Sequence, residues 1–196
     1  MFPPAVFVAN KQIDFKLFIE LHNKRPPVAS KDRQSLDWWI ERSGFHSINK
    51  SDEVVLISDH NSGYRQLWVA RSMETYRYHM IKFLGDEYGE SADFSDFDAD
   101  HVVARVRLKE HTEAWINIFP VKSTWNRFFG AAEERNEMQI SSCDFSDGLY
   151  FMTGFEALKL FYSDISRLVD VAKGSFASEN PTISCILQEM DQLRFL

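Results

Sequence analysis

The sequence predicts a single α+β domain with a central antiparallel or mixed sheet and about four to five helices. The chain has 196 residues, of which 44% are hydrophobic and 14% aromatic, enough apolar side chain to fill one core. Segments with the two-residue alternation of strands are interspersed with segments of helical spacing. Because they do not alternate regularly as strand, helix and strand, a parallel α/β sheet is not expected.

Five segments have the composition and alternation of strands. The first is AVFVA at 5–9, close to the N-terminus. EVVLIS at 53–58 and QLWVAR at 66–71 flank the turn-rich DHNSG, which predicts a hairpin. The remaining two are VVARVRL at 102–108 and AWINIFPV at 114–121. These segments are expected to form the sheet.

Four segments place apolar residues at helical spacing and are expected to be helices: 31–43, 72–84, 153–173 and 181–194. Ser30 is expected to cap the first helix, and Ser72 the second, which Gly85 ends. Thr153 and Glu156 have the spacing of a capping box at the start of the third helix. The fourth follows an Asn-Pro pair, a common helix start.

The whole chain, 1–196, is expected to form one globular domain with a helical C-terminal part at 153–196. It has no run of about eighteen apolar residues, so no membrane span is predicted. The N-terminus lacks the basic and apolar regions of a secretory signal. Cys143 and Cys185 have neither zinc-site nor redox-pair spacing, which favours reduced thiols and a cytoplasmic location.

The net charge of −7 comes from one segment. Residues 86–100 contain seven acids and no base, and the rest of the chain has 22 acids and 22 bases. The segment that follows, 101–130, is mildly basic. An acidic segment beside a basic one suits a metal ion next to a phosphate, and it also suits an ordinary solvated loop, which is the commoner case.

The segment 93–136 contains the residues most typical of a catalytic site. Asp100 and His101 precede an expected strand, a second strand follows, and Asn126 lies in a short helix expected to start at Ser123. This order of strand, strand and helix resembles the ββα-metal finger of HNH endonucleases. The resemblance covers about a fifth of the chain. The family's last His and the Cys pairs that brace many such fingers are absent.

The resemblance implies a role for each matching residue. His101 would be the general base that activates water, and Asn126 would orient the finger. Asp100 would bind a divalent ion, Mg²⁺ or Mn²⁺, with Glu134 standing where the family has its last His.

Two arginines complete this hypothesis. Arg105 and Arg127 would bind the phosphates of a nucleic-acid substrate. The resemblance thus predicts a metal-dependent nuclease, or a degenerate descendant that has lost activity.

A shorter resemblance lies at residues 63–70. Gly63, Tyr64, Arg65 and Gln66 are similar to the Gly-x-Arg-Arg box of the ParB/sulfiredoxin fold, although the second Arg is replaced by Gln66. Some fertility-inhibition proteins of conjugative plasmids have that fold, so this resemblance implies phosphate binding or a role in a mobile element. A hairpin turn with an exposed arginine is the alternative.

The aromatic content supports a different class of function. Seventeen Phe and five Trp are many for this length, so some rings are expected at the surface. An acidic protein with surface rings can bind a basic partner protein. The alternative to the nuclease is therefore a non-catalytic inhibitor or regulatory binding protein.

Overall fold

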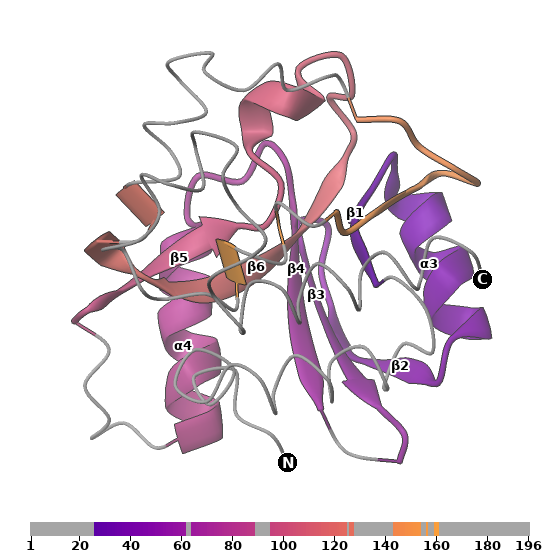
Figure 1. The fold of residues 1–196 in the computed structure, drawn as a ribbon. Coiled ribbons are helices and arrows are strands. Elements are labelled where there is room, and N and C mark those ends of the chain that lie inside the picture. The colour runs from indigo at the N-terminus through magenta and orange to yellow at the C-terminus, as the bar shows by residue number, and fades with distance from the viewer. Residues whose placement is uncertain are drawn as a thin grey trace, which may run out of the picture.

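The strands of the protein form one curled antiparallel sheet, a half-barrel with a helix on each side (Figure 1). This arrangement comes from a computed structural model. The described residues are 26–61, 64–88, 95–124, 126–127, 143–153, 156 and 159–160.

The sheet has seven strands, and every pair between them is antiparallel. Their bounds are β1 Pro27–Ser30, β2 Phe45–Lys50, β3 Val54–Asp59, β4 Arg65–Ala70, β5 Phe97–His101, β6 Trp115–Lys122 and β7 Leu149–Phe151. The order across the sheet is β2-β3-β4-β6-β1-β7, and β5 also pairs with β6.

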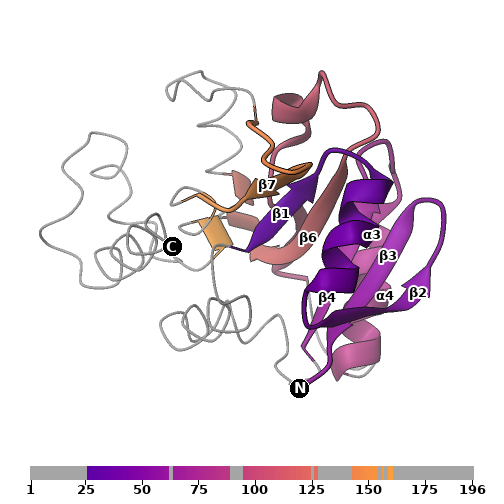
Figure 2. The same ribbon diagram turned by 90° about the vertical axis from the view of Figure 1, so that its right-hand side faces the viewer.

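Strand β6 has three neighbours because two of them share one of its edges. Ile118 of β6 lies opposite Leu67 of β4 and also opposite His101 of β5, so these two strands lie on different edges of β6. Strand β1 pairs with Trp115 and Ile116, where β4 is also paired, so β1 must share the edge of β5. The sheet therefore divides along β6, with β1 and β7 on one branch (Figure 2) and β5 on the other (Figure 1).

The two α-helices of the described residues, α3 (Arg33–Arg42) and α4 (Tyr76–Tyr88), lie on opposite faces of the sheet (Figures 1 and 2). Alternation along the strands explains this, because successive side chains of a strand point to opposite faces. One core cluster joins Trp39 of α3 to Val55 and Trp68. The other joins Met80 of α4 to Val69 and neighbouring strand residues.

The expected class had four to five helices, and this prediction is wrong. Within the described residues, seven antiparallel strands dominate, with two α-helices, one short 3-10 helix at Arg105–Leu108 and further helical residues at 123–124, 126–127, 156 and 159–160. The sequence pattern did not show strands β1, β2 and β7. Strand β1 begins at Pro27, a residue that suggested a break, and β2 and β7 lack a clear apolar alternation.

The acidic segment was expected to be a loop before a strand at 102–108, and this prediction is also wrong. The strand is β5, Phe97–His101, and residues 105–108 form the 3-10 helix. The apolar residues that suggested a strand, Val102 and Val103, are buried in the core at the turn after β5. Val102 and Val103 are therefore hydrophobic because they are buried in the core, and not because they belong to a strand.

Other elements agree with the sequence within a few residues. Strands β3, β4 and β6 lie where 53–58, 66–71 and 114–121 predicted them. Helix α3 buries Leu36, Trp39 and Ile40 as expected, but its cap is Asp32, whose carboxylate accepts from Ser35 N–H at 2.7 Å, and not Ser30.

Helix α4 starts four residues later than expected and also ends four residues later. The end is later because Gly85 continues the helix and does not end it. The expected strand at 5–9 and the helix at 181–194 lie outside the described residues. Of the helix at 153–173, Thr153, Glu156, Lys159 and Leu160 are described, the last three as helical.

A tight turn fastens β7 to α3. Ser146 and Leu149 exchange two backbone hydrogen bonds of 2.8 and 2.9 Å around Asp147 and Gly148, which both have positive φ, 51° and 76°. A Cβ on Gly148 would lie 2.2 Å from Ser35 Oγ, so glycine is required for both conformation and space. The close approach of the Gly148 backbone to Ser35 holds this turn against α3.

Candidate functional site

Strand β5 carries the residues that the sequence singled out, and its pleat separates them. Asp98 and Asp100 point to one face of the strand, and His101 and Ala99 point to the other, because side chains alternate. Ala99 packs with the α4 cluster, so His101 lies on the α4 side. The expected base and the expected metal ligand therefore point away from each other.

His101 is a buried side chain in contact with α4. It is 7% exposed, its ring centroid lies 4.3 Å from that of Tyr76, and its Nε2 has no hydrogen-bond partner among the described residues. Burial, helped by the positive charges of Arg105 and Lys159, lowers the pKa of His101 to about 3. At neutral pH the imidazole is uncharged and is enclosed by protein atoms.

Asp100 forms a buried ion pair across the domain. Its carboxylate oxygen lies 2.7 Å from Nζ of Lys159, and both side chains are almost fully buried. Burial raises the pKa of Asp100, and the ammonium of Lys159 opposes that shift. Lys159 also donates to the carbonyl oxygen of His101 at 3.2 Å. One lysine thus holds both the side chain of Asp100 and the backbone of the next residue.

A second buried ion pair joins the same region to the 3-10 helix. Arg107 Nη1 donates to Glu156 Oε1 at 2.6 Å, and its Nη2 donates to the Tyr150 hydroxyl at 2.8 Å. Tyr150 donates to the same oxygen of Glu156 at 3.2 Å. Burial opposes the charge of Arg107, but Glu156 outweighs it and raises the pKa of the guanidinium. Burial and Glu156 also raise the pKa of the Tyr150 hydroxyl.

Glu156 completes its hydrogen bonding at the start of the C-terminal helical segment. Its second oxygen accepts from the backbone N–H of Thr153 at 2.8 Å and from the Thr153 hydroxyl. The first of these is the return bond of the predicted capping box. Nearby, the thiol of Cys143 is free and 4% exposed, and burial raises its pKa to about 11. This thiol is not activated as a nucleophile.

Asn126 contacts Asp98 and not the expected pair. Asp98 accepts from Ser123 Oγ at 2.9 Å, from Arg77 Nη1 at 3.1 Å and from Asn126 Nδ2 at 3.4 Å. Partial burial disfavours the charge of Asp98, but these donors outweigh it and lower the pKa of the carboxyl. Asp98 is therefore a stable anion that ties α4, β5 and the chain after β6 together.

The remaining predicted residues are dispersed. Arg105 is exposed on the 3-10 helix, with its guanidinium 5.4 Å from the Tyr76 ring centroid, and Arg127 is exposed. Glu134 lies outside the described residues. Among the residues that are described, no three His, Cys, Asp or Glu side chains are grouped to hold a metal ion. Because Lys159 occupies the carboxylate of Asp100, the described ligands do not fit the expected metal site.

The segment that resembles the ParB/sulfiredoxin box is part of the sheet. Tyr64 is buried, and Arg65 begins β4. The side-chain oxygen of Gln66 accepts from the Trp68 indole N–H at 3.0 Å inside the core. The residue that replaces the second arginine of the box is thus a packing residue of β4.

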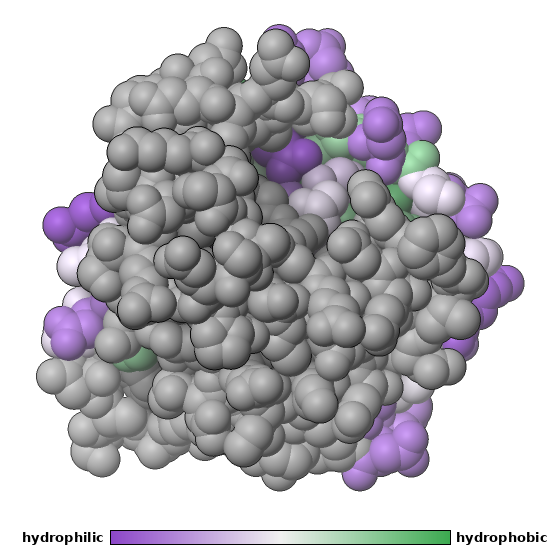
Figure 3. Space-filling view, viewed as in Figure 1, coloured by the Kyte–Doolittle hydropathy of each residue, from purple (hydrophilic) through white to green (hydrophobic). Residues whose placement is uncertain are grey.

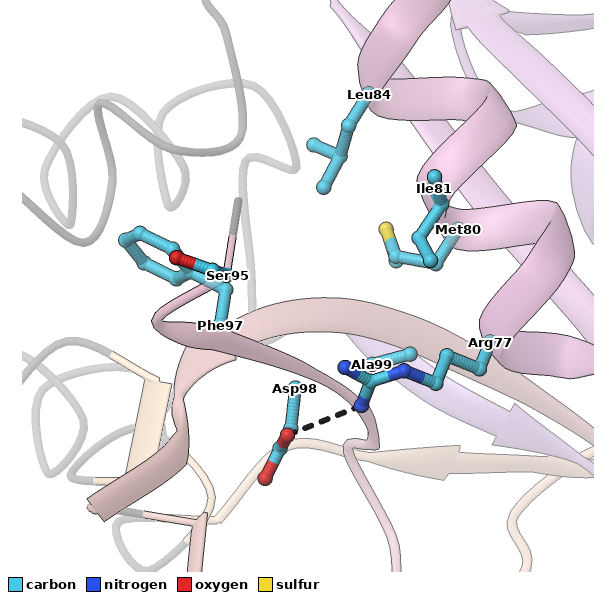
Figure 4. A pocket seen from close by; sticks show the side chains of 8 residues that line it. All are labelled: Arg77, Met80, Ile81, Leu84, Ser95, Phe97, Asp98 and Ala99. Atoms are coloured by element: carbon cyan, nitrogen blue, oxygen red, sulfur yellow. Dashed lines mark hydrogen bonds and ion pairs between the residues drawn. The ribbon is translucent and has the colours of Figure 1, made fainter. Parts of the chain in front are cut away.

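A surface feature that the sequence analysis did not locate lies between α4 and β5. A pocket of about 230 Å³ is lined by Arg77, Met80, Ile81, Leu84, Ser95, Phe97, Asp98 and Ala99 (Figure 4). The α4 side chains form one wall, β5 forms the other, and the Arg77–Asp98 ion pair lies at one end.

Exposed apolar side chains accompany this pocket. Tyr78 is 64% exposed and Ile81 is 52% exposed, both on α4. In the view of Figure 3 most of the coloured residues are hydrophilic, and the large hydrophobic residues that are exposed among the described residues are Trp38, Ile48, Tyr78, Ile81 and Val106. The helical pattern of 72–84 could have placed Tyr78 and Ile81 outside the core face, because neither belongs to the face formed by the buried Met80, Phe83 and Leu84.

Comparison of the chain with protein-family models, with curated proteins and with solved structures found no match. No helix among the described residues is long and apolar enough to cross a membrane.

Proposed function

We propose that this protein is a non-catalytic binding protein that uses the surface of α4 and β5 to hold a basic segment of a partner protein. The observation that carries the proposal is the exposure of Ile81 in the wall of an apolar pocket, with the exposed Tyr78 three residues before it on α4 and the exposed carboxylates of Asp86 and Asp96 on or next to the two elements that form the pocket walls. Aromatic and aliphatic anchors with a charged rim are typical of binding surfaces.

The charge of this surface selects the partner. The described carboxylates that this surface exposes are Asp86 on α4 and Asp96 before β5, since Asp98 and Asp100 are already paired with Arg77 and Lys159. Complementary charge speeds association and disfavours acidic competitors, so a basic segment is the expected ligand. The buried thiol of Cys143 suits a reducing cytoplasm, which is part of this proposal.

The state of the expected catalytic residues also supports a binding role. A general base must reach a substrate proton, and its pKa must lie near the working pH. His101 is 7% exposed with a pKa of about 3, and Asp100 is bonded to Lys159. In the described residues these groups serve the packing of β5 against its neighbours.

Peptide binding tests the proposal. A fluorescent peptide of alternating Lys and Leu is titrated with the full chain, and a peptide of alternating Glu and Leu is the charge control. The Lys-Leu peptide is expected to bind, more weakly at high salt, and the Glu-Leu peptide is not. Ile81→Ser is expected to weaken binding roughly tenfold, the effect of losing an interface anchor.

The matched control is Ile48→Ser, because Ile48 is also exposed, at 44%, but lies on β2. It is expected to leave the dissociation constant unchanged. Equal binding of both peptides, or equal loss in both variants, would show that the α4–β5 surface is not the binding site.

A further inference from the structure

The backbone of β5 has one edge that no described strand occupies. Ser123 N–H bonds to Asp96 C=O at one end of the β5–β6 pairing, and Val102 N–H bonds to Asn117 C=O at the other. Backbone groups of an antiparallel strand face alternate edges. Those of Asp98 and Asp100 therefore face β6, and those of Phe97, Ala99 and His101 face the other edge.

The position of Lys159 agrees with this alternation. Its ammonium donates to the carbonyl oxygen of His101 at 3.2 Å, so the C-terminal end of the outer edge is already occupied. Among the described residues, Phe97 and Ala99 have no strand on that edge. Both are partly exposed, and both line the pocket beside α4. The pocket and the outer backbone edge are therefore adjacent.

A charged side chain protects this edge. Helix α4 lies on the face of Ala99, whereas Asp98 points to the opposite face, so Arg77 reaches Asp98 around the outer edge (Figure 4). Charged side chains commonly protect sheet edges from unwanted pairing. The Arg77 side chain is 56% exposed, so another cation can approach Asp98 in its place, while Ser123 and Asn126 still donate to the carboxylate.

We propose that the basic partner segment binds in extended form as an additional strand on β5, beside Phe97 and Ala99. This inference rests on the proposed function and adds the binding mode. Alternate side chains of the added strand enter the pocket beside Met80 and Leu84, where apolar groups fit. The intervening side chains face Asp96 and Asp98, where basic groups fit. The ligand therefore alternates basic and apolar residues.

Backbone methylation of the ligand separates strand addition from side-chain docking. Two Lys-Leu peptides are compared, one N-methylated on every Leu and the other on every Lys. In an extended strand these two sets of N–H groups lie on opposite edges. Strand addition predicts that one methylated peptide loses affinity at least about tenfold and the other binds like the parent peptide. Equal binding of both, or equal loss, overturns the inference.

A substitution in the protein provides the second measurement. Ala99→Pro removes an N–H that faces the outer edge. The hydrogen bonds between β5 and β6 are kept, because Ala99 and the opposite residue, Pro120, form a pair without hydrogen bonds between them. Ala99→Pro is expected to weaken Lys-Leu binding about tenfold, whereas Ile48→Pro, which places a proline on β2 at the opposite end of the sheet order, is not. Circular dichroism confirms that both variants fold, and equal binding by both variants also overturns the inference.

These results are distinguishable from a failure of the proposed function. If the unmodified peptide does not bind the wild type, or binds without dependence on Ile81, the proposed function fails together with the inference. If Ile81→Ser weakens binding but the two methylated peptides behave alike, the surface binds its ligand by side chains alone. In that case only strand addition is overturned.

Discussion

The ammonium nitrogen of Lys159 lies 2.7 Å from the carboxylate of Asp100, inside the domain and almost without solvent contact. The two residues are far apart in sequence, and three positions before Lys159 the carboxylate of Glu156 pairs with Arg107 in the opposite sense. The anion Glu156 thus pairs with Arg107 of the 3-10 helix, and the cation Lys159 pairs with Asp100 of β5. Shifting the short helical segment that carries Glu156 and Lys159 along its axis would break both pairs, so they fix its position.

The Asp100–Lys159 pair predicts strong coupling between the two residues. Asp100→Asn and Lys159→Met are each expected to destabilise the fold by about 3–5 kcal/mol, because each leaves an unpaired buried charge. The double variant is expected to recover a large part of that loss. Urea unfolding of the four proteins measures the coupling. The control is the partly exposed Asp37, which pairs with Arg33 and Lys50 near the surface, and Asp37→Asn is expected to cost about 1 kcal/mol or less. Additive losses at Asp100 and Lys159 would contradict this prediction.

His101 predicts a pH dependence of stability. Its pKa is about 3 in the folded state against a reference of 6.5, so between these values the unfolded chain binds more protons. The contribution is complete above about pH 6.5 and is lost as pH falls, by up to about 1.4 kcal/mol per pH unit. His101→Phe is expected to flatten the dependence of the unfolding free energy on pH in this window. Equal slopes in wild type and His101→Phe would refute the burial of a neutral imidazole.

Gly148 in the Asp147–Gly148 turn and Gly85 in α4 are expected to respond to alanine substitution in opposite ways. Gly148→Ala is expected to destabilise by at least about 1 kcal/mol, because Gly148 has a φ of 76° and its Cβ would lie 2.2 Å from Ser35 Oγ. Gly85→Ala is expected to stabilise by about 0.5–1 kcal/mol, since it lies within α4 and its Cβ would meet no atom within 4 Å. Differential scanning calorimetry measures the melting temperature of both variants. A melting temperature that does not fall in Gly148→Ala would be inconsistent with the turn geometry.

The nuclease hypothesis has a direct assay. With Mg²⁺ or Mn²⁺ the purified protein is expected to leave plasmid DNA intact, and its melting temperature is expected to stay unchanged, because Lys159 already neutralises Asp100. His101→Ala is expected to lower the melting temperature, since it removes a packed ring beside Tyr76. Metal-dependent cleavage that disappears in His101→Ala would instead establish His101 as a general base and overturn the proposed function.

The parts of the fold visible in the sequence are those whose burial is regular. Strands β3, β4 and β6 show the alternation of a two-faced sheet, and the Leu36–Trp39–Ile40 spacing placed α3 correctly. Strand β5 was missed because an edge strand can carry charge, and here Asp98 and Asp100 are both satisfied by partners from other elements. The signal for β7 was present in the Asp147–Gly148 pair, which is typical of hairpin turns.

The candidate site was less accessible to sequence reasoning, because its determinants are long-range. The sequence pattern placed Asp100 and His101 side by side in a motif, but the pleat of β5 directs them to opposite faces. Lys159 carried no sequence signal, because nothing near it indicates an acidic partner on a distant strand. Glu156 was predicted only as a helix cap, and its second role, as the partner of Arg107, depends on tertiary packing.

The shared edge of β6 constrains the order in which the chain can assemble. Strand β1 is synthesised before the other described strands, yet its two neighbours, β6 and β7, are synthesised late. On the ribosome, the β2–β3–β4 meander can pair as it emerges, whereas β1 must wait with its backbone groups solvated. Strand β1 gains its two strand partners only once β6 and β7 have been synthesised, one on each of its edges. Completion of the sheet therefore joins an early and a late part of the polypeptide, which couples folding of the domain to the release of its C-terminal half.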